Sequence, residues 1–279
     1  MTDKKLMTIQ DISCYGQCSI TVAQPIISAC GVETAILPSA VLSTHTGGFT
    51  NFTFRDLTDD IPKINQHWVS EGIKFDAILS GYLGSRTQIG YVRDLWKDVL
   101  NDGGLKITDP AMADNGKLYY GFDDAFVKEM AGLCADADII LPNLTEACFM
   151  TGYDFRPDNQ DRKYIACLIR EFALKGVQTI VLKGVSFEPD KLGIVVYDKG
   201  EVKEYFTDRV SKSFHGTGDC FAAAFAGAVL QGYEAFDAAK LAADFVVRCI
   251  KDTMNDESHW YGVKFERALP LLVERLNHE

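Results

Sequence analysis

The stretch that decides the fold is Phe214-His215-Gly216-Thr217-Gly218-Asp219-Cys220-Phe221-Ala222-Ala223-Ala224-Phe225. Two glycines flank a threonine, an acid follows, and a run of small and aromatic residues predicts a buried helix. Gly216 and Gly218 allow a close backbone approach with N–H groups turned outward, and the helix adds the positive end of its dipole. The pattern predicts an anion-binding turn. Asp219 beside it suggests a proton acceptor and hence phosphoryl transfer to an alcohol.

The same residues also fit an ordinary helix start. In that interpretation Thr217 is the N-cap and Asp219 lies in the first turn, where an acid complements the helix dipole. The stretch alone does not choose between these two possibilities.

Length and charge limit the class of protein. A chain of 279 residues can bury a sizeable core as one large α/β domain or two small ones. No apolar run approaches the roughly 20 residues that a membrane span needs. The formal net charge of −11 disfavours nucleic acid and anionic membranes as partners.

The N-terminus and the cysteines suggest the compartment. Residues 1–12 contain no signal-peptide apolar segment or cleavage site. None of the eight cysteines forms a CxxC pair, and most lie in apolar helical patterns. We therefore expect a cytoplasmic protein whose thiols act as small apolar residues, without a disulfide framework or a zinc site.

Strand and helix patterns alternate along the chain. Expected strands are residues 7–12, 33–38, 75–80, 105–110, 138–143 and 177–183, followed by a hairpin of 192–197 and 202–207. A first helix is expected to begin near residue 20. The other expected helices cover about 57–71, 87–100, 123–135, 161–175, 217–225, 236–251 and 264–276. This order predicts a three-layer α/β/α fold, a mostly parallel central sheet with helices on both faces, and one domain over residues 1–279.

Polar residues follow almost every expected strand. Ligands of such sheets bind at the carboxyl ends of the strands, so these side chains are the candidates for a site. They are Asp11 and Ser13, Ser43 to Thr46, Tyr82, Asp109, Asn143 with Glu146, Lys183, and the turn from Gly216 to Asp219.

Three of these residues have a nucleotide-related interpretation and an ordinary one. Asn143 and Glu146, in the sequence Asn-Leu-Thr-Glu, can share one helix face and suit Mg²⁺, but they also match a capping box. Lys183 can contact a nucleotide phosphate as a point charge, or can extend from the end of a buried strand to solvent.

The motifs together resemble a known superfamily. Asn143-x-x-Glu146 followed by Gly216-Thr217-Gly218-Asp219 resembles the ribokinase-like small-molecule kinases. The segments that resemble the pyridoxal (pyridoxamine) kinase family within it are Ser80 to Ser85, Thr44 to Gly47, Asp109-Pro110-x-x-Ala113 and Leu141 to Leu144. The matches run in the family's order from Gln10 to Phe225 and so cover most of the chain.

The resemblance implies ATP-dependent phosphorylation of the 5′-hydroxymethyl group of a vitamin B6 vitamer. It implies Mg²⁺, often a monovalent cation such as K⁺, a homodimer, and no separate lid domain. The implied catalytic residues are the base Asp219 and the anion hole of Gly216, Thr217 and Gly218. The residues implied to bind the B6 vitamer are Asp11, Ser13, His45, Thr46 and Tyr82. The residues implied to bind ATP are Asp109, Tyr119, Asn143, Lys183 and Gly218. The residues implied to bind the metal are Glu146, Asn143 and Asp109.

Two positions depart from the family. Asp11 stands where many members have a serine that contacts the pyridine ring, and a carboxylate there would favour the charged aminomethyl group of pyridoxamine. Alternatively, Asp11 accepts backbone N–H groups and Ser13 contacts the ring. His215 stands where some relatives carry a cysteine, so we expect no covalent hemithioacetal with an aldehyde substrate.

Three other functions are compatible with parts of the sequence. A hydroxymethylpyrimidine kinase shares the Gly-Thr-Gly-Asp turn. A non-catalytic B6-binding protein would share the fold, although Asp219 argues against it. A nicotinamide-dependent oxidoreductase would need GxGxxG after the first strand, where the stretch from Ser13 to Cys18 has one glycine.

Overall fold

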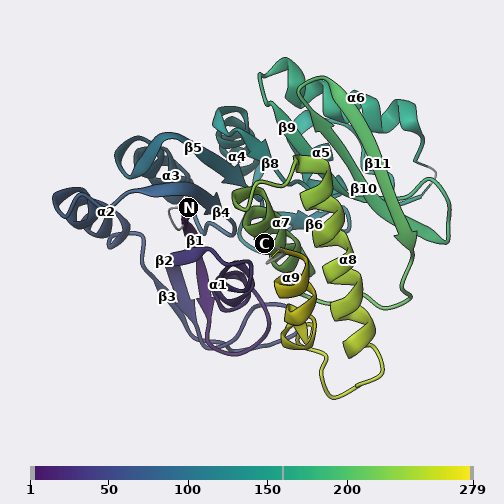
Figure 1. The fold of residues 1–279 in the computed structure, drawn as a ribbon, viewed down its shortest axis with the longest axis horizontal. Coiled ribbons are helices and arrows are strands. Elements are labelled where there is room, and N and C mark those ends of the chain that lie inside the picture. The colour runs from purple at the N-terminus through teal and green to yellow at the C-terminus, as the bar shows by residue number, and fades with distance from the viewer. Residues whose placement is uncertain (1–3, 159, 277–279) are drawn as a thin grey trace. The chain divides into compact units, whose positions relative to one another are not determined.

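The computed structural model describes residues 4–158 and 160–276, which form two compact units (Figure 1). The first unit comprises Met1–Leu105 and Val210–Glu279, and the second comprises Lys106–Arg209. The prediction of one domain over residues 1–279 stays a prediction.

The first unit contains five strands, of which β5 continues into the second unit. They are β1 (Lys5–Ser13), β2 (Glu33–Leu42), β3 (Phe54–Asp56), β4 (Phe75–Ser80) and β5 (Leu100–Thr108), hydrogen-bonded in the order β5-β4-β1-β2-β3. The strands β2 and β4 pair with β1 in parallel, and β3 adds to β2 in antiparallel orientation.

Helices cover this part of the sheet. They are α1 (Ile20–Ala29), α2 (Ile61–Ser70), α3 (Arg86–Asp98), α7 (Thr217–Leu230), α8 (Ala235–Thr253), the short 3₁₀ helix η1 (Phe265–Arg267) and α9 (Leu269–Leu276). The helices α1 and α7 pack against each other and contact β1, β2 and β4, whereas α2 packs on α3 and contacts β2. Residues 6–11 of β1 are all buried, as expected for a strand covered on both faces.

The second unit continues the same layout. Its strands are β6 (Ala113–Asp114), β7 (Lys117–Leu118), β8 (Ile139–Ile140), β9 (Thr179–Val185), β10 (Lys191–Asp198) and β11 (Glu201–Asp208), and its helices are α4 (Asp124–Asp136), α5 (Leu144–Thr151) and α6 (Arg162–Leu174). The strand order is β11-β10-β9-β8-β5, with β6 and β7 in a separate two-stranded sheet. Strands β5, β8 and β9 are parallel, while β10 is antiparallel to both of its neighbours.

The expected fold class is confirmed, and so is the hairpin. Its turn is Lys199-Gly200, with Asp198 paired to Glu201. Both turn residues have positive φ, 47° and 101°, as a two-residue hairpin with the twist of the strands requires.

Three local expectations are wrong. The helix expected over 87–100 ends at Asp98, and the strand expected over 105–110 already begins at Leu100 as β5, with Gly103 at a φ of 75° within it. Strand β3 was not expected, because an exposed three-residue edge strand has no alternating apolar pattern. The expected helix 264–276 is divided into η1 and α9, because Pro270 lacks an N–H and can occupy only the first turn of a helix.

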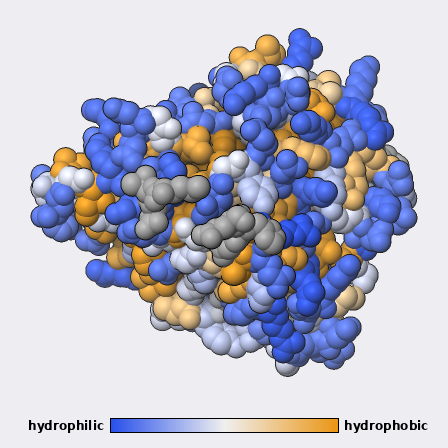
Figure 2. Space-filling model, viewed as in Figure 1, coloured by the Kyte–Doolittle hydropathy of each residue, from blue (hydrophilic) through white to orange (hydrophobic). Residues whose placement is uncertain are grey.

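The surface carries both hydrophilic and hydrophobic residues. On the face shown in Figure 2 the hydrophilic residues are spread among hydrophobic ones. Within the part of the chain described, no helix is long and apolar enough to cross a bilayer.

The core of the first unit gives a stability prediction. Phe245 of α8 is fully buried, so Phe245→Ala should lower the free energy of unfolding by about 3–5 kcal/mol. Val273 of α9 is 42% exposed, so Val273→Ala should change the same quantity by less than about 1 kcal/mol. Urea denaturation of both variants measures the difference, and equal losses would contradict this assignment of the core.

Candidate active site

The turn before α7 has the geometry expected of an anion-binding loop. Gly216 is the N-cap residue in left-handed conformation, with φ 75° and ψ 0°. A Cβ at this position would lie 1.7 Å from the carbonyl oxygen of Gln17. Only glycine fits here, because any side chain would collide with the loop that follows β1.

The alternative in which Thr217 caps this helix is wrong. Thr217 is the first helical residue, and its hydroxyl donates to the carbonyl oxygen of Phe214 at 3.2 Å. No N-cap side chain hydrogen-bonds to the first turn of α7. The first-turn N–H groups are therefore not satisfied by a cap, which is the condition for binding an anion at a helix N-terminus.

Asp219 lies in the first turn of α7 and contacts the loop after β1. Its Oδ2 accepts a hydrogen bond from the backbone N–H of Ser19 at 2.9 Å. The nearby Cys18 thiol has a pKa raised well above its usual value, by burial first and then by the charges of Asp219 and Asp11. The two acids lie close together, because Ser19 donates to both of them, to Asp219 through its N–H and to Asp11 through its hydroxyl.

Asp11 is buried, 5% exposed, near the end of β1. The β1–β2 register is irregular between Gln10 and Ile12, a feature common where a strand presents a side chain to a site. Both carboxylate oxygens accept from hydroxyl groups: Oδ1 from Ser19 at 2.6 Å and Oδ2 from Ser13 at 2.9 Å. Burial raises the pKa of Asp11, and the two hydroxyl groups partly offset that rise.

The remaining predicted substrate residues lie at the ends of neighbouring strands. Burial, followed by the charge of Asp11, raises the pKa of Tyr82, which follows β4. Thr46 is exposed and His45 is buried, both in the loop after β2. The His45 ring is 5.4 Å from that of His215, which precedes the anion-binding turn. The predicted acceptor-side residues thus gather around β1, β2 and β4.

Hydrogen bonds determine the tautomer of His45. Its Nε2 is 2.8 Å from the carbonyl oxygen of Tyr261, and its Nδ1 accepts from the N–H of Gly47 at 3.0 Å. A carbonyl can only accept and an N–H can only donate, so the ring is neutral with its proton on Nε2. Burial lowers the pKa of His45, and the hydrogen bond to Tyr261 opposes that effect.

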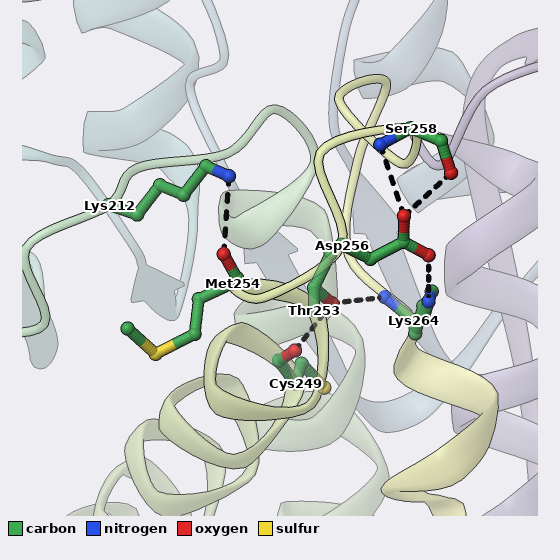
Figure 3. Close-up of polar contacts among 7 residues, drawn as sticks. All are labelled: Lys212, Cys249, Thr253, Met254, Asp256, Ser258 and Lys264. Atoms are coloured by element: carbon green, nitrogen blue, oxygen red, sulfur yellow. Dashed lines mark hydrogen bonds and ion pairs between the residues drawn. The ribbon is translucent and has the colours of Figure 1, made fainter.

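The segment that carries Tyr261 is fixed by polar contacts (Figure 3). Asp256 accepts from Lys264 and from both the N–H and the hydroxyl of Ser258. The Thr253 hydroxyl accepts from the Lys264 N–H at 2.8 Å and donates to the Cys249 carbonyl at 2.7 Å. Lys212 donates to the Met254 carbonyl. These contacts close the loop between α8 and η1, which presents the Tyr261 carbonyl to His45.

The second unit carries a separate group of predicted residues. Asp109, 4% exposed after β5, accepts a hydrogen bond from Lys183 of β9, with Oδ1 and Nζ 2.9 Å apart. Burial raises the pKa of Asp109, whereas the Lys183 ammonium group lowers it. Lys183 is therefore held beside a buried carboxylate rather than extended to solvent.

Asn143 and Glu146 form the capping box at the start of α5. Asn143 Oδ1 accepts from the Glu146 N–H at 2.9 Å, and Glu146 Oε2 accepts from the Asn143 N–H at 2.7 Å. Burial first, and then the charge of Asp109, raise the pKa of Glu146 to about 8. The ordinary interpretation is thus confirmed in geometry, and the same acid lies close enough to Asp109 for the two charges to interact.

The residue Tyr119 follows the short β6–β7 hairpin and is 41% exposed. This hairpin is attached to the start of α5, since Gly116 donates to Thr145 Oγ1 at 3.1 Å and Asn143 Nδ2 donates to the Ala113 carbonyl at 2.8 Å. Among the residues described, no three His, Cys, Asp or Glu side chains form a cluster suited to a metal ion.

Two residues that orient the predicted ones were missed. Ser19 directly precedes a predicted helix, so its sequence position suggests only an N-cap. Tyr261 contributes a backbone carbonyl, and no residue type signals that contribution. Neither contact can be found from the sequence, because 200 and 216 residues separate the partners.

Comparison with known proteins shows which family the chain belongs to. The sequence profile of a family described as phosphomethylpyrimidine kinase matches residues 26–263. The chain belongs to this kinase family. A pyridoxal kinase of Granulibacter bethesdensis is 27% identical over 260 residues, which cover 89% of each protein. The expected membership of the pyridoxal kinase group within the ribokinase-like superfamily is confirmed.

Solved structures of this kinase family agree. A Bacteroides thetaiotaomicron protein, described provisionally as a phosphomethylpyrimidine kinase and crystallised with pyridoxal, is 35% identical, with a TM-score of 0.91 and coverage of 97% of this chain and 96% of its own. Pyridoxal kinase of Lactobacillus plantarum is 28% identical, with a TM-score of 0.88 and coverage of 99% of both chains.

The state of His45 gives a pH prediction for this kinase. Its pKa is lowered in the folded protein, so the unfolded chain takes up the proton first as the pH falls. The contribution of the neutral ring to stability should be complete above about pH 6.5 and decrease below it. His45→Gln should remove that part of the acid-side loss in urea unfolding.

A histidine from another part of the first unit supplies the control. His67→Gln changes an exposed imidazole on α2 and should retain the acid-side loss caused by His45. Identical pH dependence in the wild type and His45→Gln would contradict the lowered pKa and the neutral state assigned to the ring.

Proposed function

We propose that the protein transfers the γ-phosphoryl group of ATP to the 5′-hydroxymethyl group of a vitamin B6 vitamer. The observation that carries this proposal is Asp219, which stands in the first turn of α7 directly after the uncapped glycine turn. A proton acceptor next to an anion-binding turn is what phosphorylation of an alcohol needs. The pyridoxal kinases among the relatives, and the Bacteroides structure with pyridoxal, supply the acceptor class.

The first unit would receive the acceptor. The hydroxymethyl oxygen attacks the γ-phosphorus while Asp219 accepts its proton, and the N–H groups of the turn from Gly216 to Gly218 stabilise negative charge on the transferred group. His45, Thr46 and Tyr82 would contact or support the pyridine ring. Because His45 is neutral and hydrogen-bonded through both ring nitrogens, it would stabilise the loop after β2. Any charged contact with the vitamer would then come from Asp11.

The second unit would bind the nucleotide phosphates. Lys183, placed beside Asp109, would supply a positive charge, and Tyr119 would lie over the nucleotide. The donor set fits Mg²⁺ in ligand type, because Asp109 and Glu146 are buried carboxylates and Mg²⁺ prefers oxygen ligands. Together with Asn143, these residues would hold the ion, whose positive charge would offset charge on the phosphates.

Several finer expectations follow from the family resemblance. We propose that the enzyme works as a homodimer in the cytoplasm and that K⁺ assists Mg²⁺–ATP. The motif segments after β1, β2 and β4 favour a B6 vitamer over hydroxymethylpyrimidine as the acceptor. The presence of Asp219 favours an enzyme over a B6-binding protein without activity.

An assay of ADP release tests the reaction and its acceptor. With Mg²⁺–ATP, we expect turnover of pyridoxal, pyridoxamine and pyridoxine. The kcat/KM for hydroxymethylpyrimidine should be at least about tenfold lower than for these vitamers, the discrimination that one favourable contact with the substrate provides. A preference for hydroxymethylpyrimidine would reverse the assignment, and vitamer binding without ADP release would favour the storage protein.

Removal of the base tests the role of Asp219. Asp219→Ala should lower kcat by about 10²–10⁴-fold, while the vitamer still binds. Asp237→Ala is the matched control, because Asp237 is an exposed acid in the first turn of α8. Near-normal kcat in Asp219→Ala would refute the assignment.

Asp11 tests the preference among vitamers. A buried carboxylate should favour the cationic aminomethyl group of pyridoxamine, so Asp11→Ser should lower the pyridoxamine-to-pyridoxal ratio of kcat/KM by about tenfold or more. Asp237→Ser makes the same change at an exposed position and should leave the ratio unchanged. An unchanged ratio in Asp11→Ser would mean that the Asp11 carboxylate only accepts hydrogen bonds from Ser13 and Ser19 and does not contact the vitamer.

A further inference from the structure

Ser19 has a backbone conformation that is unfavourable for any residue with a side chain. Its φ is 57° and its ψ is −137°, and it is 6% exposed. Such conformations persist only where the surroundings impose them, and they are concentrated at functional sites. At an ordinary helix start the serine hydroxyl would accept from the first turn of the helix. In α1 that cap hydrogen bond is not formed.

Instead, both donors of Ser19 are directed at carboxylates. The backbone N–H donates to Asp219 Oδ2 at 2.9 Å, and the hydroxyl donates to Asp11 Oδ1 at 2.6 Å. One strained residue therefore joins the proposed base to the acid proposed to select the vitamer. These two acids are 208 residues apart in sequence.

We propose that Ser19 is a positioning residue, which orients the base Asp219 through its N–H and couples it to Asp11 through its hydroxyl. By holding Oδ2, the N–H fixes the orientation of the Asp219 carboxylate, which takes the proton of the acceptor. By donating to Asp11, the hydroxyl keeps the Asp11 carboxylate in a fixed position relative to Asp219. This inference rests on the proposed function of Asp219.

The strain of Ser19 allows positioning to be separated from stability. Ser19→Gly retains the N–H and relieves the strain but frees the backbone and removes the hydroxyl. Relief of the strain should offset part of the stability that is lost with the hydroxyl donor of Asp11, whereas kcat should fall about 10–100-fold because the base is held less precisely. A purely structural residue would change the stability and leave kcat unchanged.

Two further variants complete the kinetic experiment. Ser19→Ala keeps the strained backbone and loses only the hydroxyl, so the KM of the vitamer should rise with a smaller change in kcat. Ser28→Gly makes the glycine change at an exposed position near the end of α1, and its kinetics should match the wild type. Wild-type kcat in Ser19→Gly, within about twofold, would overturn the proposal.

A measurement that needs no turnover keeps this inference separate from the proposed function. The titratable groups around the two acids are Cys18, Cys220, His45 and Tyr82. With ¹³C-labelled aspartate, the carboxyl pKa of Asp219 should rise in Ser19→Gly and that of Asp11 should rise in Ser19→Ala, because each loses or loosens a donor. Unchanged values would overturn the coupling even if no vitamer is phosphorylated by the wild type.

Discussion

The first unit depends on a contact that leaves no room for a side chain. The carbonyl oxygen of Gln17 lies where a Cβ of residue 216 would stand, so the loop after β1 and the start of α7 can meet only through a glycine. This contact brings the Ser19 N–H to Asp219. The candidate anion-binding turn and the proposed base are consequently positioned by a loop nearly 200 residues earlier in the chain.

Each buried charge at the strand ends has a different kind of partner. Hydroxyl groups surround Asp11, backbone N–H groups bind Glu146, and an ammonium group is paired with Asp109. Burial raises the pKa of all three acids, and without these donors their desolvation would destabilise the fold. The three acids can thus be buried because each accepts hydrogen bonds. The type of donor differs from acid to acid and gives each carboxyl group its own electrostatic environment.

Local patterns predicted those features that depend on neighbouring residues. The alternation of strands and helices, the Lys199-Gly200 hairpin and the pairing of Asn143 with Glu146 all follow from short-range rules. The same rules left open a cap at Thr217 that is not formed, and they placed the start of the strand after α3 at residue 105, five residues too late. In both places residues outside the local pattern decide the conformation, since Gly216 takes the N-cap position of α7 and the sheet extends β5 back to Leu100.

By itself, the sequence determined the fold class and the family and named the candidate site residues, because strand-end position and motif spacing are local properties. Only the tertiary structure decided how those residues act together. It placed the Tyr261 carbonyl on His45, which settles the tautomer, and the Ser19 donors on Asp11 and Asp219, which join two acids at opposite ends of the chain. Such contacts arise from packing between distant loops, and a hydrogen bond from a backbone group has no residue type to reveal it.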